Sequence, residues 1–517
     1  MSIGQISAET MQNLGNRSLS AFFWGAGGSV ARIVLQLCTQ IALARILGPE
    51  QYGLFAIGAI VVSFSNFFSD IGIAYGLIQK TEVNSRDLRF VFTWQLIIGS
   101  LVTLAVAGFS QPIAEFFGEP NAHEVVFALA VVCLLNALAA PSNNMLKRNL
   151  DFKRVQIAQL AGYIGGYIVI GLPLALAGAQ VWALVVAWIS QAIIIFLILY
   201  TSAKHSLRPL FWYEDAKSLS SYGALVLVTN ITNWTIGNID RVIIGRFFSG
   251  REIGLYATTY NLLQSPTSSL LAVIQPVFFS ASSRVGDDKT KIVNGYYALL
   301  SAICLCVFPI FAAVSSVAET FVLAVYGDKW IESAVVFRPL ALAMPLFLIW
   351  GMTTPLLWSG GTPAREFKTQ LPVALLWIAV SWFAAHHSMA MVGWAVCGMF
   401  ALRCFIMIFT ASKSLELPWV HLWRCVRGGL SVSVACAALC AGLDYVLRDL
   451  MPEQHASRLI LVIVASASFY LLLLTRVPSV ISLEFAELIV RLADRCPKSV
   501  AHQLRMLARA KAPNVDR

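Results

Sequence analysis

Charged side chains are scarce in this sequence of 517 residues, and their scarcity excludes an ordinary soluble fold. Asp, Glu, Lys and Arg together make up 12% of the chain, against roughly a quarter in a typical soluble domain. Hydrophobic residues reach 58%. Long apolar segments are typical of membrane-spanning helices. The composition therefore predicts an all-α, polytopic membrane protein.

The sequence also has little that would support metal, redox or nucleotide chemistry. Its 10 cysteines are scattered, with Cys304/Cys306 and Cys436/Cys440 as the only close pairs, and no histidine stands at ligand spacing. The glycine-rich segment 25–28 lacks a preceding strand and a following Lys-Ser/Thr, which favours close helix packing over phosphate binding. We expect no cofactor, no metal and no ATP hydrolysis, with coupling to H⁺ or Na⁺ left open.

Positive charge is concentrated in short loops rather than in one basic domain. The net charge of +10 therefore predicts membrane orientation and does not indicate nucleic-acid binding. Residues 1–20 are polar and lack the layout of a cleaved signal peptide, so we expect the first span to be an uncleaved signal-anchor. Loops rich in Lys and Arg are predicted to be cytoplasmic, with both termini on that side; Arg251, Lys329 and Arg448 are exceptions on the opposite side.

Apolar windows of about 20 residues predict about fourteen membrane-spanning helices. Their approximate ranges are 21–47, 53–78, 89–110, 122–145, 155–176, 180–202, 220–248, 252–280, 292–316, 332–358, 369–386, 389–411, 422–446 and 458–476. We expect two lobes of six helices, in residues 1–205 and 206–415, joined by a cytoplasmic hinge at Ala203–Leu219. Two further spans (416–478) and an amphipathic tail on the cytoplasmic surface (479–517) follow.

An internal repeat supports the division into two lobes. Residues 41–56 read IALARILGPEQYGLFA and residues 242–257 read VIIGRFFSGREIGLYA, so that Gly53 aligns with Gly254. A second match follows, since residues 117–119 and 326–328 both read aromatic, glycine, acid. Each predicted unit holds an even number of spans, so the copies insert with the same orientation about an axis along the membrane normal. This organisation is typical of transporters.

Polar residues recur in matching spans of the two lobes. An ionisable side chain near the middle of a membrane costs at least about 2.5 kcal/mol, so it needs a partner or a watery cavity. We predict that these stripes line one central, net cationic cavity suited to a sugar-bearing anion. The predicted substrate-binding residues are Arg32, Gln36 and Gln40 on the first span, Asn230, Asn233 and Arg241 on the seventh, and Arg338 on the tenth.

Two intramembrane acids have two possible roles. Asp70 and Asp240 either hold the cavity arginines in place or couple transport to an ion. The alternative for Arg32 is a structural arginine paired with one of these acids. Asp240 and Arg241 are adjacent and point in different directions on a helix, so each requires another partner.

Several motifs together resemble a known family. They are residues 47–55 (LGPEQYGLF), residues 68–72 (FSDIG), Asp240 followed by residues 244–247 (IGRF), and residues 326–330 (YGDKW). The combination, within about residues 15–415, resembles the polysaccharide transporters. These are the Wzx-type lipid-linked oligosaccharide flippases of the multidrug, oligosaccharidyl-lipid and polysaccharide exporter superfamily.

The resemblance implies a V-shaped pair of six-helix lobes that open alternately to either side of the bacterial inner membrane. The implied substrate is an undecaprenyl-pyrophosphate-linked oligosaccharide, flipped for exopolysaccharide or O-antigen synthesis, with polysaccharide polymerase and export proteins as possible partners. A drug or small-molecule antiporter of the same superfamily is the main alternative, and it would favour acidic cavity residues. A membrane glycosyltransferase or polymerase would require a large periplasmic loop, whereas the predicted periplasmic loops are short.

Overall fold

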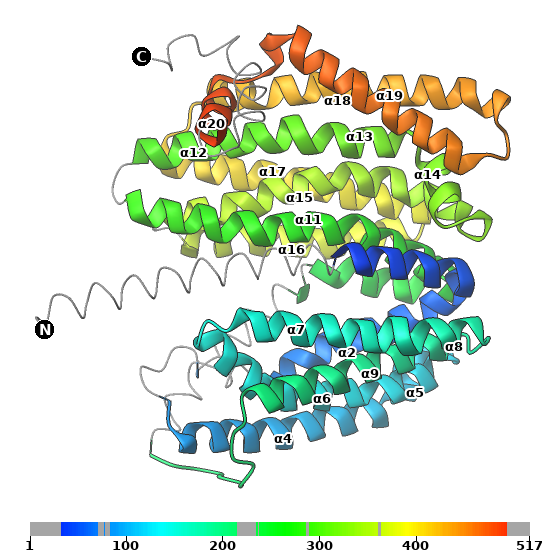
Figure 1. Cartoon of the computed structure of the whole chain (residues 1–517), viewed down its shortest axis with the longest axis vertical. Coiled ribbons are helices and arrows are strands. Elements are labelled where there is room, and N and C mark those ends of the chain that lie inside the picture. Colours follow the sequence, from blue (N-terminus) through cyan, green and yellow to red (C-terminus); the bar gives the residue numbers. More distant parts are fainter. Residues whose placement is uncertain are drawn as a thin grey trace, which may run out of the picture. The chain divides into compact units, whose positions relative to one another are not determined.

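The computed structural model describes residues 33–70, 77, 83–214, 234–235, 237–285, 289–359 and 363–493. Helices account for most of these residues, and no β-strand occurs within the described ranges. The predicted all-α fold is confirmed. The chain divides into two compact units, residues 1–258 and 259–517, which we describe one at a time (Figure 1).

Ten helices in the described part of the chain are long and apolar enough to cross a membrane. Two shorter apolar helices, Ile33–Leu47 and Pro372–Ala385, lie in further predicted spans. The chain is therefore a multi-pass membrane protein. The count of fourteen spans stays a prediction. The seventh predicted span extends beyond the described residues, and the eighth, 252–280, lies in α11 (Gly250–Val285), which is not among the ten.

The first unit is a bundle of helices packed around one central helix. Its central helix is α6 (Ala122–Arg148), which packs against α2, α4 and α9. Val125 and Leu129 of α6 are fully buried beside Val62 of α2 and Val185 of α9. The helices of this unit are Ile33–Leu47, α2 (Pro49–Asp70), α4 (Ser85–Gly108), α5 (Ser110–Phe116), α6, α7 (Phe152–Tyr163), a π-helical segment (Ile164–Gly171), α8 (Leu172–Leu176), α9 (Val181–Ser202), residues 237–247 and the start of α11 (Gly250–Val285).

The segment after α9, which begins the predicted hinge, is held against α4 by side-chain hydrogen bonds. Arg89 donates to the carbonyl oxygens of Arg208 and Pro209, at 3.0 and 3.1 Å. Trp94 donates to the carbonyl of Phe211, at 3.0 Å. The Leu210 amide donates to the Thr93 hydroxyl, at 2.9 Å. Residues 203–214 therefore belong structurally to the first unit.

The second unit is built on α15 and α17, which pack along each other, while α18 packs against α13 and α19 (Figure 1). Its helices are the rest of α11, α12 (Lys289–Ala302), a π-helical segment (Ile303–Val307), α13 (Phe308–Ser316), α14 (Ala318–Val325), a 3₁₀ helix (Asp328–Ser333), α15 (Ala334–Ser359), α16 (Pro363–Ala385), α17 (Met389–Leu415), α18 (Trp419–Leu450), α19 (His455–Arg476), a 3₁₀ turn (Pro478–Val480) and α20 (Leu483–Ala493).

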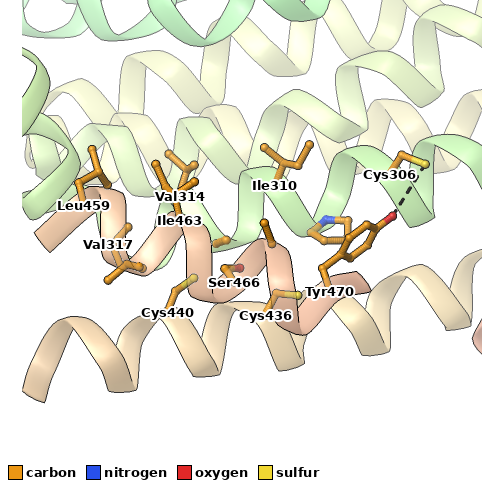
Figure 2. A pocket seen from close by; sticks show the side chains of 14 residues that line it. Cys306, Ile310, Val314, Val317, Cys436, Cys440, Leu459, Ile463, Ser466 and Tyr470 are labelled. Atoms are coloured by element: carbon orange, nitrogen blue, oxygen red, sulfur yellow. Dashed lines mark hydrogen bonds between the residues drawn. The ribbon is translucent and has the colours of Figure 1, made fainter. Parts of the chain in front are cut away.

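A proline at the start of α13 leaves a backbone carbonyl free to bind a side chain of α19. Pro309 has no N–H, so it cannot donate to the carbonyl oxygen four residues earlier, that of Leu305. The local helix widens into a π-turn over Ile303–Val307. The Tyr470 hydroxyl of α19 donates to the Leu305 carbonyl, at 3.0 Å. Figure 2 shows Tyr470 reaching this segment, where it also lies 4.0 Å from the Cys306 sulfur.

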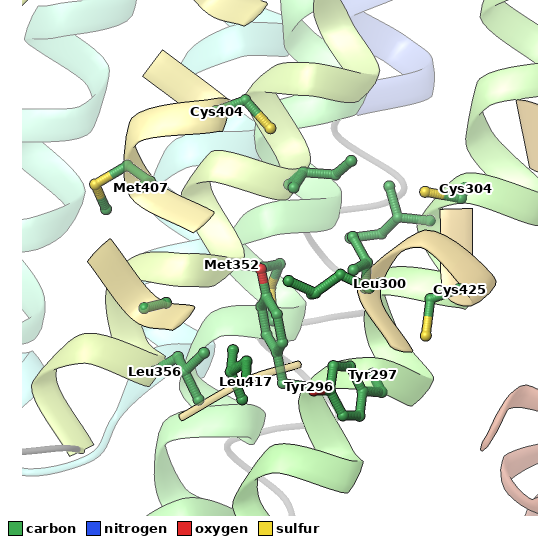
Figure 3. Close-up of a cluster of buried hydrophobic side chains, with 14 of the residues drawn as sticks. Tyr296, Tyr297, Leu300, Cys304, Met352, Leu356, Cys404, Met407, Leu417 and Cys425 are labelled. Atoms are coloured by element: carbon green, nitrogen blue, oxygen red, sulfur yellow. The ribbon is translucent and has the colours of Figure 1, made fainter. Parts of the chain in front are cut away.

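The core of the second unit is apolar with one polar pair inside it. Tyr296 of α12 is 1% exposed and shares a hydrogen bond of 2.9 Å with Thr353 of α15. Met352, Leu356 and other apolar side chains surround this pair (Figure 3). Because both hydroxyl groups have a partner, neither carries the full cost of burying an unpaired polar group.

The predicted amphipathic tail forms helix α20. Ala486 and Ile489 are buried against Leu305 and Val432, so the apolar side of this helix packs on the protein. The side chain of Leu488 is not among those described, and Arg495 lies outside the described residues. The cytoplasmic location of this segment stays a prediction.

Candidate functional site

The first predicted polar stripe lies on the helix Ile33–Leu47. Gln36 and Gln40 are half-buried on this helix, one turn apart. Within the described part of the chain their side-chain amides make no hydrogen bond, whereas their backbone carbonyls accept from Tyr163, at 3.4 Å, and Tyr52, at 3.3 Å. Two amide groups are thus available to a ligand. Arg32 lies outside the described residues.

Two stacked tyrosines adjoin this stripe. The rings of Tyr163 and Tyr167 lie 4.9 Å apart with an interplanar angle of 18°. Tyr163 is nearly buried, and its hydroxyl reaches the backbone of Gln36. Aromatic rings beside free amides supply both an apolar surface and hydrogen-bonding groups.

The second predicted stripe lies on helical residues 237–247. Asp240 is 1% exposed and accepts a hydrogen bond of 2.6 Å from the Tyr256 hydroxyl of α11. Arg241 is half-buried and lies 3.4 Å from the Asn238 side-chain oxygen. The two neighbours therefore do have separate partners, as their positions on a helix require. Asn230 and Asn233 lie outside the described residues.

Two polar residues of α2 that follow the first copy of the motif also have hydrogen-bond partners. The Trp234 indole donates to the Ser63 hydroxyl, at 3.1 Å, and Asn136 of α6 donates to Asn66, at 3.2 Å. Asp70 is the last residue of α2, and its side chain is not among those described.

The two copies of the repeated motif contact each other directly. A Cβ atom added at Gly53 would lie 1.7 Å from the carbonyl oxygen of Gly250, and one at Gly254 would lie 1.9 Å from that of Pro49. In the alignment, Gly53 matches Gly254 and Pro49 matches Gly250, so these two contacts are equivalent. The motif is therefore a self-complementary crossing of α2 and α11 about a local pseudo-twofold axis, and only glycine permits it.

Ion pairs account for two of the three exceptions to the loop-charge pattern. Arg251 lies 3.8 Å from Glu50, and Arg448 donates to Glu319. Each exceptional cation is thus accompanied by a carboxylate.

Arg338 belongs to the same ionic network as Arg448. Its guanidinium donates to Glu319 of α14, at 2.8 Å. Next along α14, Thr320 donates to Asp444, at 2.6 Å, and accepts from the buried Arg458, at 2.7 Å. The network ties α18 and α19 to α14 and α15. Arg338 thereby has a structural contact, and its role in substrate binding stays a prediction.

An apolar pocket of about 260 Å³ lies between α13, α18 and α19 (Figure 2). Ile310, Val314 and Ile463 point into it, and Ser466 and Tyr470 provide its few polar atoms. Such a lining suits an aliphatic chain and offers nothing that would bind a charge.

Sequence reasoning missed the partner of Asp240, although the repeat contained a signal for it. Tyr256 aligns with Phe55, and Asp240 aligns with Thr39. In the second copy Phe is replaced by Tyr, which adds a hydroxyl donor, and Thr is replaced by Asp, which adds a carboxylate acceptor. The stacked Tyr163/Tyr167 pair left no comparable pattern in the sequence.

The fold and these polar helices define a multi-pass helical membrane protein built around an internal repeat. The chain belongs to a family described as polysaccharide biosynthesis protein, whose pattern matches residues 42–335. This range is more than half of the chain. The predicted relationship to polysaccharide transporters is confirmed.

Individual relatives agree with this family. The lipopolysaccharide biosynthesis protein WzxC of Escherichia coli K12 is 23% identical over 62% of this chain, and the match spans 65% of WzxC, just under two thirds. The teichuronic acid biosynthesis protein TuaB of Bacillus subtilis is 22% identical over 90% of this chain and 97% of its own length.

Two solved structures share the fold. The lipid II flippase MurJ in an inward closed conformation matches with a TM-score of 0.71, at 13% identity, over 87% of this chain and 97% of MurJ. An inward-facing multidrug transporter of the MATE family, from the MOP superfamily, matches with a TM-score of 0.56, at 13% identity, over 76% of this chain and 98% of that one.

Proposed function

We propose that this protein is a flippase for undecaprenyl-pyrophosphate-linked oligosaccharide repeat units. It moves them from the cytoplasmic to the periplasmic leaflet for exopolysaccharide or O-antigen synthesis. The observation that carries the proposal is membership of the polysaccharide biosynthesis family, together with the match to TuaB over almost the full length of both chains. In this proposal the protein is a transporter and not an enzyme.

The proposed binding site is the polar cavity predicted from the sequence. The side-chain amides of Gln36 and Gln40, which make no hydrogen bond to any described residue, and the adjacent Tyr163/Tyr167 stack support sugar binding. Arg32 and Arg241 would bind the pyrophosphate, because a guanidinium matches phosphate oxygens with two parallel donors. The remaining proposed contacts are Asn230, Asn233 and Arg338.

The lipid part of the substrate needs an apolar site of its own. The pocket between α13, α18 and α19 has this chemistry, with a lining dominated by Ile, Val, Leu and Cys side chains. We assign it to a segment of the polyprenyl chain during transport. The sugar and pyrophosphate then remain in the polar cavity.

Transport by alternating access has a natural driving force for this substrate. Moving an anion outward across a membrane that is negative inside is favoured by about 2.3 kcal/mol per charge per 100 mV. The hydrogen bond between Tyr256 and Asp240 supports a structural role for Asp240 over ion coupling. Asp70 remains the candidate for H⁺ or Na⁺ coupling.

The proposed setting is the bacterial inner membrane, with both termini in the cytoplasm. The direct partner is the lipid-linked oligosaccharide, and polysaccharide polymerase and export proteins would act on the flipped product. Cysteines introduced at Ser218 and Ser388 test the orientation. An impermeant thiol reagent added to intact cells should label the second and not the first.

Complementation of a flippase-deficient strain tests the substrate site. The Gln36→Ala, Gln40→Ala double variant and the Arg32→Ala, Arg241→Ala double variant should reach normal abundance and lose most polysaccharide export. Lysine at the arginine positions should restore part of it. Arg154→Ala is the matched control, because this arginine pairs with Asp151 on the surface. Normal export by both double variants would overturn the proposed site.

A drug or small-molecule antiporter is the alternative, supported by the fold shared with the MATE transporter. Proteoliposomes with an imposed potential separate the two functions. A flippase should move a polyprenyl-pyrophosphate saccharide with the potential alone. Ion-gradient-driven export of a small cation, without movement of the lipid-linked saccharide, would favour the antiporter.

A further inference from the structure

A second pocket in this protein is lined mainly by polar and charged side chains, in contrast to the apolar pocket described above. It has a volume of about 330 Å³ and lies between the start of α18 and the turn that precedes α20. Three basic residues of α18, His421, Arg424 and Arg427, line one side. Ser479, Ile481, Ser482, Leu483 and Glu484 line the other.

The two arginines of this pocket are available to a ligand. His421, Arg424 and Arg427 follow one another at intervals of three, so their side chains lie along one side of the helix. Within the described residues neither arginine has a hydrogen bond or an ion pair, and both are exposed. Glu484 lies in the same pocket without pairing to either of them. These arginines are therefore not explained as members of a structural salt bridge.

The wall opposite the arginines is fixed by backbone packing. A Cβ atom added at Gly428 would lie 2.0 Å from the carbonyl oxygen of Val480, so the turn before α20 rests directly on α18. Ser482 donates to Ser301, at 2.8 Å, and accepts from the Phe485 amide, at 3.2 Å. The pocket is thus preformed, which lowers the entropic cost of filling it.

Aromatic residues place this pocket at the depth of lipid headgroups. Trp419 and Trp423 lie on the same turns of α18 and are 46% and 61% exposed. Tryptophan is enriched where membrane-spanning helices meet the membrane surface. The arginines beside them lie at the end of a 32-residue helix, where their charge can reach the phosphate layer. This is the side that the loop charges predict to be cytoplasmic.

We propose that this pocket binds the headgroup of an anionic phospholipid from the adjacent leaflet. Arg424 and Arg427 bind the phosphate, and the hydroxyl groups of Ser479 and Ser482 line the rest of the headgroup site. The two arginines and the single carboxylate leave a net positive pocket, which favours an anionic lipid over a zwitterionic one. Glu484 accepts a hydrogen bond from a headgroup hydroxyl, which favours phosphatidylglycerol. None of its residues belongs to the proposed substrate site, so the proposal does not depend on that site.

Native mass spectrometry of the full chain in detergent tests the proposal. With phosphatidylglycerol, phosphatidylethanolamine and phosphatidylcholine offered at equal concentration, the protein should retain phosphatidylglycerol preferentially. The Arg424→Gln, Arg427→Gln double variant should lose about tenfold or more of this retention, since each arginine contributes a charge-assisted hydrogen bond. Arg476→Gln is the matched control, because this arginine is exposed at the end of α19 near the same surface and does not line the pocket.

Two further measurements in the same experiment identify the ligand. Glu484→Ala removes the hydroxyl acceptor, so it should reduce the preference for phosphatidylglycerol over phosphatidic acid, which lacks the glycerol headgroup. Inorganic phosphate should compete weakly, because it has no acyl chains to hold it in the membrane. Equal retention of all three lipids, or equal losses in the Arg476→Gln control, would overturn the proposal. So would free phosphate that binds as tightly as the lipid.

Thermal unfolding provides a readout that does not rely on mass spectrometry. Added phosphatidylglycerol should raise the melting temperature of the wild-type protein, because a ligand that binds only the folded state stabilises it. The double variant should fold, with a melting temperature near that of the lipid-free wild type, and should not respond to the lipid. A normal lipid response in the double variant would contradict the assignment.

Discussion

The two copies of the repeated motif follow similar backbone paths and carry different polar groups. In each copy a helix ends and the next begins within three residues, at Gly48 and at Phe248–Ser249. The first copy has Thr39 and Phe55 where the second has Asp240 and Tyr256. The glycines at the crossing are the same in both. Backbone geometry is thus common to the two copies, and the buried ionisable pair belongs to one of them.

This difference separates the crossing glycines, which both copies of the motif require, from the Asp240/Tyr256 pair, which only the second copy has. A close helix crossing depends on the absence of a Cβ atom. Replacing either glycine with a larger residue would therefore push the two helices apart. The Asp240/Tyr256 pair depends on two side chains, which can be replaced together. Changes at the crossing should therefore have larger effects than changes at the pair.

The largest effect is expected at the crossing itself. Gly53→Ala and Gly254→Ala each place a Cβ atom within 2 Å of a backbone carbonyl oxygen, which no side-chain movement can relieve. We expect loss of most folded protein from the membrane, measured by abundance and by thermal unfolding in detergent. Gly442→Ala is the control, since nothing lies within 4 Å of its added Cβ. A Gly53→Ala protein as stable as this control would contradict the crossing.

An intermediate effect is expected at the buried pair. Tyr256→Phe removes a hydrogen bond to an almost fully buried carboxyl group, at a cost of about 1–3 kcal/mol. The double variant Asp240→Thr, Tyr256→Phe gives the second copy the residues of the first, and it should lose less stability than Tyr256→Phe alone. Melting temperatures of the two single variants and the double variant form the test. Losses that simply add would show that the two groups are not coupled.

The sequence predicted the helices well because apolar runs and their polar stripes are local features. Gln36, Gln40 and the α20 helix were all visible in this way. The contact between Asp240 and Tyr256 crosses a helix break, and the Leu305 to Tyr470 link joins positions 165 residues apart. Such links depend on which helices become neighbours, and a single sequence without the fold does not specify this.

The two ends of the first unit offer a second comparison. At the motif the backbones touch, whereas residues 203–214 are held on α4 by side chains. The His205 ring packs against Phe92 and Tyr200, and burial lowers the pKa of His205 below its usual range. The neutral form therefore stabilises this segment at neutral pH, and the contribution is lost as the pH falls below about 6.5.

A pH series tests this assignment. The wild-type melting temperature should fall more steeply than that of His205→Gln as the pH drops from about 7.5 to about 5.5. Gly442→Ala on α18 changes no titratable group, so its curve should follow the wild type. Parallel curves for the wild type and His205→Gln would show that this histidine does not stabilise the segment.

The smallest effect is expected at the ion pair between the two copies of the motif. Glu50 and Arg251 occupy equivalent positions with opposite charges, and their side chains are 69% and 37% exposed. An exposed pair of this kind contributes less than about 1 kcal/mol and weakens with added salt. Arg251→Glu should therefore lower the melting temperature slightly at low salt, and the exchanged variant Glu50→Arg, Arg251→Glu should recover it. A large loss in the exchanged variant would mean that side-chain identity, rather than opposite charge, matters at this position. The crossing would then depend on more than its glycines.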